Sequence, residues 1–223
     1  MRYRHFVAAL VLLAPAAAHA VEPSDLKPGL VANYSDVRGG IHSPNVTRLE
    51  PTVAITLASK AETPHPMLDS GGIMTWKGFV NVTRAGKYTF SATARGGKLT
   101  VSVAGKVVVE AESKDKEEVA LSGPEAAFDG GVYPFEATFL RVMSETGSRV
   151  ELFWQGPGFV REPLAHQFLG HLPKDRPKEF TADGALEHGR FKFEELACVK
   201  CHKPAADDKM AKTLVERTGP NLT

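Results

Sequence analysis

Residues 131–139 read Gly-Val-Tyr-Pro-Phe-Glu-Ala-Thr-Phe, and this stretch gives the clearest indication of the fold. Its apolar side chains, Tyr133, Phe135, Ala137 and Phe139, alternate with Pro, Glu and Thr. Side chains two positions apart in a β-strand lie on the same face of the strand. The alternation therefore predicts a strand with one buried face and one solvated face.

The same alternation recurs on both sides of this stretch, and turns that contain glycine separate the runs. Many short strands, each with one apolar face, predict antiparallel sheets that pack together. We therefore expect a mainly β fold, an antiparallel β-sandwich, over residues 21–172. The other alternating sets are Val53, Ile55 and Leu57; Tyr88, Phe90 and Ala92; Leu99, Val101 and Val103; and Val150, Leu152 and Trp154, with turns at Ala85-Gly86, Gly96-Gly97, Ala104-Gly105, Gly130-Gly131 and Gly147.

A stretch rich in proline and lysine, residues 173–182, follows the β region, and we expect it to form a solvated linker. The pattern then changes to a helical period in residues 183–223, where Thr181 or Asp183 can cap the helix. The expected fold is thus a β-sandwich followed by a short α-helical segment. The apolar stripe of this helix would contain Leu186, Phe193, Leu196 and Ala197.

The first 20 residues differ in composition from the rest of the chain. Arg2 and Arg4 precede an apolar run, and Ala18-His19-Ala20 has the small-x-small pattern of a cleavage site. These features predict a secretory signal peptide over residues 1–20, with an uncleaved N-terminal anchor as the alternative. A membrane-spanning helix needs about 20 apolar residues, and no later segment has them. We therefore expect a periplasmic or extracellular protein without a membrane span in the mature chain.

Positive and negative charges are balanced along the chain, with 27 basic and 26 acidic residues and a formal net charge of +1. Binding to nucleic acid needs a concentrated positive field, so we expect no nucleic-acid partner. No paired carboxylates and no Ser/His/Asp set stand out as catalytic groups. The sequence thus favours an electron carrier or a binding protein over an enzyme.

The two cysteines of the chain, Cys198 and Cys201, are followed directly by His202 in the sequence Cys-Val-Lys-Cys-His. Two thiols at this spacing can each add to one vinyl group of the same haem, and the adjacent imidazole is then held under the iron. A cysteine pair followed by histidine is a signature of covalent haem attachment. We therefore expect haem c at Cys198 and Cys201, with His202 as an axial iron ligand and the sixth ligand unassigned.

Three other interpretations of the cysteine pair stay open. A thioredoxin-like redox pair needs a βαβ setting, and a structural zinc site needs two further ligands at finger-like spacing. A disulfide across so short a loop gains little stability and strains its geometry. The export signal favours haem over these three, because c-type haem is attached on the far side of the membrane.

The residues around the cysteines resemble the start of a bacterial class I cytochrome c. Gly189 and Phe193 match positions before the haem motif, and Gly219-Pro220-Asn221-Leu222 matches the family's Gly-Pro-x-Leu after it. By this resemblance the Pro220 carbonyl accepts a hydrogen bond from the second ring nitrogen of His202, and such a bond orients a metal-bound imidazole. A plain turn is the alternative role for Gly219-Pro220.

The chain departs from that family downstream of the haem motif. The family supplies a distal methionine and a last helix, whereas residues 183–223 resemble only the front portion of such a domain. Met210 follows His202 too closely to reach the opposite face of the ring, so we do not expect it to be a ligand. Either the chain is truncated, or a partner completes the pocket, or the sixth site is open or holds water.

Six motifs follow one another in the β region: Gly-Leu-Val-Ala-Asn-Tyr (29–34), Trp-Lys-Gly-Phe (76–79), Ala-Gly-Lys-Tyr-Thr-Phe (85–90), Leu-Thr-Val-Ser-Val-Ala-Gly-Lys (99–106), Gly-Val-Tyr-Pro-Phe (131–135) and Glu-Leu-Phe-Trp-Gln-Gly-Pro-Gly (151–158). In this order they resemble the protective-antigen fourteen-kilodalton-type (PA-fourteen) domain, a β-sandwich of adhesins, glycosidases and toxins. Some members bind sugars through a calcium ion held by paired aspartates. The corresponding residues here are Ala94-Arg95-Gly96-Gly97-Lys98, which contain no aspartate. Calcium prefers several oxygen ligands, so we do not expect this chain to bind calcium.

Seven further side chains are candidates for a site, each with a simpler structural role that we favour. Two tryptophans could stack on a sugar but are expected in the core, and three aspartates could be loop ligands but are expected to form turns. Two histidines could bind a metal or the sixth haem position but are expected at the surface. These residues are Trp76 and Trp154, Asp36, Asp69 and Asp129, and His166 and His171.

Together these observations predict an exported c-type cytochrome with a β-sandwich docking module. One covalent haem would transfer electrons to a redox partner protein, and the sandwich would dock this carrier either on a polysaccharide or beside a dehydrogenase. The alternative is an extracellular carbohydrate-binding or adhesion module with a vestigial haem segment. A haem peroxidase is a third hypothesis, favoured only if the sixth iron site is open.

Overall fold

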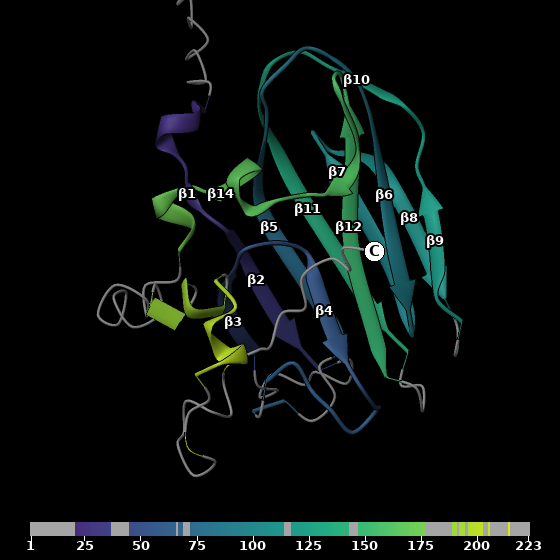
Figure 1. The fold of residues 1–223 in the computed structure, drawn as a ribbon, viewed down its shortest axis with the longest axis vertical. Coiled ribbons are helices and arrows are strands. Elements are labelled where there is room, and N and C mark those ends of the chain that lie inside the picture. Colours follow the sequence, from purple (N-terminus) through teal and green to yellow (C-terminus); the bar gives the residue numbers. More distant parts are fainter. Residues whose placement is uncertain are drawn as a thin grey trace, which may run out of the picture.

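Two antiparallel sheets pack face to face in the β region, as the ribbon in Figure 1 shows. The predicted mainly β antiparallel sandwich is therefore confirmed. The structure is a computed structural model. It describes residues 21–36, 45–65, 67–68, 72–113, 117–142, 147–176, 189–190, 192–194, 196–202, 205 and 214.

The larger sheet is formed by β1 (Lys27–Pro28), β2 (Leu30–Ser35), β3 (Asn45–Glu50), β5 (Ile73–Val82), β7 (Gly97–Val103), β8 (Lys106–Ser113), β11 (Gly131–Arg141) and β14 (Leu169–His171). Its hydrogen-bonded order is β1-β14-β5-β11-β7-β8. One half of β5 pairs with β14 and the other half with β2, which in turn pairs with β3. Beyond β5 the sheet is thus divided between the β14–β1 and β2–β3 pairs.

The smaller sheet is formed by β4 (Ala54–Leu57), β6 (Gly86–Arg95), β9 (Val119–Ser122), β10 (Ala126–Phe128), β12 (Ser148–Gly156) and β13 (Phe159–Pro163). Its order is β10-β6-β12-β13, with β4 added to β12 and β9 added to β6. Short 3-10 helices lie outside the sheets: η1 (Pro23–Asp25), η2 (His166–Phe168), η3 (Pro173–Asp175) and η5 (Cys198–Lys200). None of the helices in the described part of the chain is long and apolar enough to cross a membrane.

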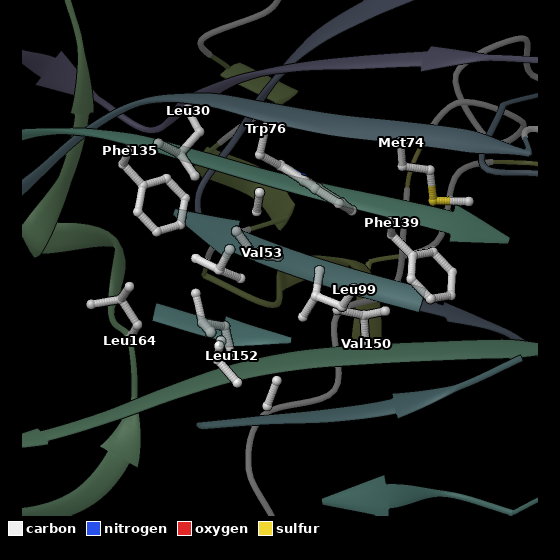
Figure 2. Packing of buried hydrophobic residues seen from close by; sticks show 14 of the residues in the cluster. Leu30, Val53, Met74, Trp76, Leu99, Phe135, Phe139, Val150, Leu152 and Leu164 are labelled. Carbon is white, nitrogen blue, oxygen red and sulfur yellow. The ribbon is translucent and has the colours of Figure 1, made fainter. Parts of the chain in front are cut away.

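The stretch that predicted the fold lies at the centre of the larger sheet. β11 pairs with β5 along one side and with β7 along the other. Phe135, Ala137 and Phe139 are at most 3% exposed, and Figure 2 shows Phe135 and Phe139 among the core side chains. The period-two alternation in this stretch therefore marks the face of β11 that packs against the smaller sheet.

Both tryptophans belong to the core, as the sequence predicts. Trp76 is fully buried and meets the Tyr34 ring edge-on at 6.2 Å between centroids. Trp154 is 2% exposed and packs against Phe168, with 4.8 Å between ring centroids, and stacks on Tyr88 at 5.6 Å. Neither indole is available to stack on a sugar at the surface.

The turn predicted at Ala104-Gly105 joins β7 to β8. Both residues have positive φ, 51° for Ala104 and 75° for Gly105. Two-residue hairpin turns that match the right-handed twist of a sheet require positive φ. The local sequence and the sheet twist therefore agree at this turn.

Candidate functional site

The residues that precede the cysteine pair lie against β3, where Arg48 contacts Glu194 (Figure 1). Residues 189–190 and 192–194 are helical. The chain then turns at Ala197, whose φ of 54° is in the left-handed region, and enters η5. A left-handed conformation costs a residue with a Cβ about 1–2 kcal/mol, so the surrounding contacts hold this turn in place.

The three residues of the predicted haem attachment site are brought together by η5. The backbone amides of Cys201 and His202 both donate to the Cys198 carbonyl, at 3.1 and 2.8 Å. Cys198 is half-buried, Cys201 and His202 are exposed, and both thiols are free. The two free thiols are thus three positions apart in the chain, with Cys201 exposed and Cys198 half-buried.

The helical stretch does not bury the apolar stripe that the sequence predicts. Leu196 is 69% exposed and Phe193 is half-buried, whereas Glu194 is fully buried and Arg190 is 9% exposed. Residues four apart share a helix face, and the Arg190 Nη1 lies 2.7 Å from the Glu194 Oε2. The face of this stretch that packs on the sandwich thus carries a pair of charges, whereas Leu196 of the predicted apolar stripe is exposed.

A buried charge cluster, made of Tyr34, Arg48, Glu50, Arg190 and Glu194, joins this stretch to the larger sheet. The Arg48 Nη2 lies 2.9 Å from the Glu194 Oε1, and the Arg48 Nε lies 3.5 Å from the Glu50 Oε1. The Tyr34 hydroxyl donates to the same Glu50 oxygen at 2.9 Å. The four charged members are at most 9% exposed. The cluster thus connects the core strand β2 to the segment that carries the cysteines.

The charges of this cluster cancel, with two guanidinium groups facing two carboxylates. Desolvation of buried ions opposes such pairs, and good geometry is needed to offset that cost. Arg190 adds a hydrogen bond from its Nη2 to the Leu49 carbonyl at 3.0 Å. We conclude that the cluster sets the position of the docked segment more than it adds net stability.

Several residues discussed from the sequence lie outside the described residues. These are Pro220, the predicted partner of His202, and Met210 and Asp69, which were considered as ligands but not expected to be; the predicted signal peptide of residues 1–20 lies outside them too. The hydrogen bond from His202 to the Pro220 carbonyl stays a prediction. The boundaries expected for the linker and for the segment 183–223 also stay predictions.

The residues that correspond to the calcium-binding stretch of PA-fourteen domains form the tight turn between β6 and β7. Gly96 lies at its centre with φ 67°. Its carbonyl accepts hydrogen bonds from the Val142 amide at 2.9 Å and from the Ser148 hydroxyl at 3.3 Å. This turn is therefore fixed to the start of β12 by its own backbone oxygen.

The two candidate histidines have different environments. His171 is 1% exposed, and its Nδ1 lies 2.8 Å from the Gly29 carbonyl. Burial lowers the pKa of His171, because desolvation disfavours the imidazolium. The prediction of a surface position was wrong for His171, since β14 is enclosed between β1 and β5. His166 is half-exposed on η2.

A groove of about 540 Å³, which we name the outer-face groove, lies on the larger sheet. Phe79 is half-buried there, whereas its neighbours Trp76 and Val80 on the opposite face are fully buried. The Lys77 Nζ lies 3.3 Å from the Glu136 Oε1 in the groove. The lining residues are Val31, Lys77, Gly78, Phe79, Ser102, Gly105, Pro134, Phe135, Glu136 and Asp175.

The outer-face groove has the composition of a small-molecule site, with one aromatic wall and a few polar groups. The sequence motif Trp-Lys-Gly-Phe contains three of its residues, Lys77, Gly78 and Phe79, but the sequence did not mark them as a site. Their partners come from β2, β7, β11 and η3, which approach only in the folded chain. No local signal could have revealed that arrangement.

The comparisons with known proteins agree with this architecture. No family model and no curated protein matches the chain. Among solved structures, the PA14 domain of the antifreeze protein MpAFP matches with a TM-score of 0.52 and 14% identity over 70% of this chain and 96% of that one. The PA14 sugar-binding domain from an RTX adhesin matches with a TM-score of 0.50 and 15% identity over 65% of this chain and 98% of that one. The fold is that of a PA14 domain.

An anti-sigma factor domain-containing protein also matches, with a TM-score of 0.56 and 16% identity over 68% of this chain. The match covers 50% of that protein, so the present chain spans about half of its length. Identities this low show the shared fold alone. The predicted resemblance to PA14 domains is confirmed at that level.

The classification of the chain as a metal-binding, electron-transferring cytochrome c was wrong. The matching structures include PA14 domains, one of them a sugar-binding domain of an adhesin. Within the described ranges, no group of three or more His, Cys, Asp or Glu side chains could hold a metal ion. The five residues of the cysteine motif do not determine the class of a chain whose fold is set by its strands. Covalent haem at Cys198 and Cys201 is a narrower statement that stays a prediction.

Proposed function

We propose that this protein is an exported carbohydrate-binding module of the adhesion type, which holds a glycan in the outer-face groove of its PA14 sandwich. The observation that carries the proposal is the groove itself, with Phe79 beside the Lys77–Glu136 pair. The fold adds support, because a solved PA14 sugar-binding domain has the same architecture. The predicted signal peptide agrees with a location outside the cytoplasm.

The chemistry of the groove suits a sugar ring. A pyranose has an apolar face of C–H groups, which packs well on an aromatic ring such as Phe79, and a rim of hydroxyls. The Lys77 and Glu136 side chains are 64% and 48% exposed, and an exposed ion pair is held by at most about 1 kcal/mol. Both groups can therefore turn to donate to and accept from hydroxyls at little cost.

We expect Phe79→Ala to weaken glycan binding at least tenfold, because the apolar wall of the groove is removed. A glycan array would identify a ligand for the wild-type chain, and calorimetry would then measure its affinity for the variant. Phe153→Ala is the matched control, since Phe153 is also half-buried but lies on the smaller sheet under Arg161. An array without binding, or an equal loss in the two variants, would refute the proposal.

The prediction of covalent haem has its own test, which does not depend on glycan binding. In a host with haem maturation machinery, we expect the peptide that contains Cys198 and Cys201 to gain the mass of one haem that survives denaturation. The double variant Cys198→Ser/Cys201→Ser should lack this mass. A colourless wild-type product, in which both thiols react with iodoacetamide, would show that the prediction is wrong.

A further inference from the structure

The outer-face groove crosses the strands of the larger sheet instead of running along one of them. Its central row consists of Val31 on β2, Lys77 on β5, Glu136 on β11 and Ser102 on β7. In the register of the sheet, each of these residues lies directly opposite the next one in the row. Directly opposed residues place their side chains on the same face of a sheet. The row therefore follows one line across four neighbouring strands.

The length of this row sets the size of the ligand. Neighbouring strands lie about 4.8 Å apart, so the three intervals between four strands give the groove a length of about 14 Å. Its volume of about 540 Å³ is within the range of sites that enclose a whole small molecule. An extended glycan advances by nearly the same distance for each sugar residue as the sheet does for each strand. The groove thus accommodates about three sugar residues in line.

The two ends of the row differ in accessibility. Opposite Val31, on β3, lies Leu49, which is 4% exposed. Opposite Ser102, on β8, lies Val107, which is 56% exposed. The accessible row therefore ends at β2 on one side and is open to solvent on the other. A glycan longer than the groove would leave it past the β7–β8 hairpin.

Apolar side chains follow one side of the central row. Phe79 on β5 and Pro134 on β11 lie directly opposite each other, two positions along the strands from Lys77 and Glu136, and both line the groove. Phe79 is half-buried and Pro134 is exposed. The groove therefore offers groups that bind hydroxyls along its length and, beside them, apolar surface for the C–H faces of sugar rings.

We propose that the outer-face groove binds a single chain of an extended β-1,4-linked glycan, with about three consecutive sugar residues lying across β2, β5, β11 and β7. This inference rests on the proposed function and specifies its class of glycan. Equatorial bonds at C1 and C4 keep such a chain straight, as the row requires, whereas α-1,4-linked glucose curls into a helix. Neighbouring strands twist by about 20°, which a single chain follows by rotation about its glycosidic bonds.

Calorimetry on the full chain would test this inference with oligomers of one to four residues of β-1,4-linked glucose, mannose, xylose and N-acetylglucosamine. In at least one series we expect the trimer to bind at least tenfold more tightly than the monomer. The tetramer should bind within about twofold of the trimer, because a fourth residue lies beyond the groove. The length series on the wild-type chain is decisive by itself.

The variant Ser102→Ile tests the direction of the chain, because its larger apolar side chain fills the β7 end of the groove. Isoleucine is favoured in strands, so the fold should be kept. We expect the trimer to lose at least tenfold in affinity, while the dimer, bound over β2, β5 and β11, changes by less than about twofold. Thr100→Ile is the matched control, since Thr100 is half-buried on the same face of β7, two positions outside the groove.

Affinity that does not rise with length, or an equal loss of trimer binding in the Ser102→Ile and Thr100→Ile variants, would overturn the inference. Binding of none of the four series would overturn it as well. If an array glycan of another linkage binds and Phe79→Ala weakens that binding, the inference fails and the proposed function stands. If no glycan of any kind binds, the proposed function fails and takes the inference with it.

Discussion

Replacing Glu194 by glutamine is expected to release the C-terminal segment from β3. The Glu194 carboxylate is fully buried and lies within 2.9 Å of both Arg48 and Arg190. Its neutral replacement leaves two guanidinium charges without the carboxylate that they share, and breaking a buried pair in this way costs about 3–5 kcal/mol. Amide hydrogen exchange should show loss of protection at residues 189–202, while β5 and β11 keep theirs.

Glu125→Gln is the matched control for this experiment. Glu125 pairs with Lys87 at 2.8 Å, but the two side chains are 55% and 72% exposed. Exposed pairs of this kind contribute about 0–1 kcal/mol, so exchange should be nearly unchanged. If residues 189–202 of the Glu194→Gln variant were protected from amide exchange as in the wild type, the charge cluster would not be what holds the C-terminal segment on β3.

Trp76→Ala is expected to destabilise the whole sandwich by about 3–5 kcal/mol, the cost of emptying a large buried aromatic site. Trp76 is fully buried at the centre of β5, and Figure 2 shows it among the core side chains. Its ring meets the Tyr34 ring edge-on. Urea unfolding would measure the change, and Trp154 provides the fluorescence signal that remains. The loss of the indole also loosens Tyr34, whose hydroxyl holds Glu50 in the buried charge cluster.

Trp76→Phe should cost clearly less than Trp76→Ala, because most of the buried volume is kept. A loss below about 1 kcal/mol for Trp76→Ala would contradict close packing around this side chain, since deletions of buried aromatic side chains rarely cost so little. Equal losses for the two variants would show that volume is not what matters at this position.

The sandwich could be predicted because its signal is local. In β7 the predicted residues Leu99, Val101 and Val103 are all at most 1% exposed, and in β12 Val150 is fully buried. Each of these strands is long enough for the alternation of apolar and polar side chains to be visible in the sequence. The strand β14 has three residues and β1 has two, so neither could show a period. This is also why the burial of His171 was missed.

The buried charge cluster could not be predicted, for two physical reasons. Arg48 and Glu194 are separated by 146 positions, and nothing in either neighbourhood specifies the other. Arginine and glutamate are also among the residues that are rarely buried, so a sequence pattern assigns them to solvent. For the same reason, the apolar stripe predicted from Phe193 and Leu196 did not reveal that Arg190 and Glu194 are the buried residues of this stretch.

The buried charge cluster allows only one placement of the cysteine-bearing segment on β3, because its two carboxylates and two guanidinium groups pair only in that placement. Sliding the helical stretch along β3 by one turn would separate each charge from its counter-charge inside the protein, so intermediate placements are disfavoured. A group attached at Cys201 or His202 would therefore keep a constant orientation toward the larger sheet.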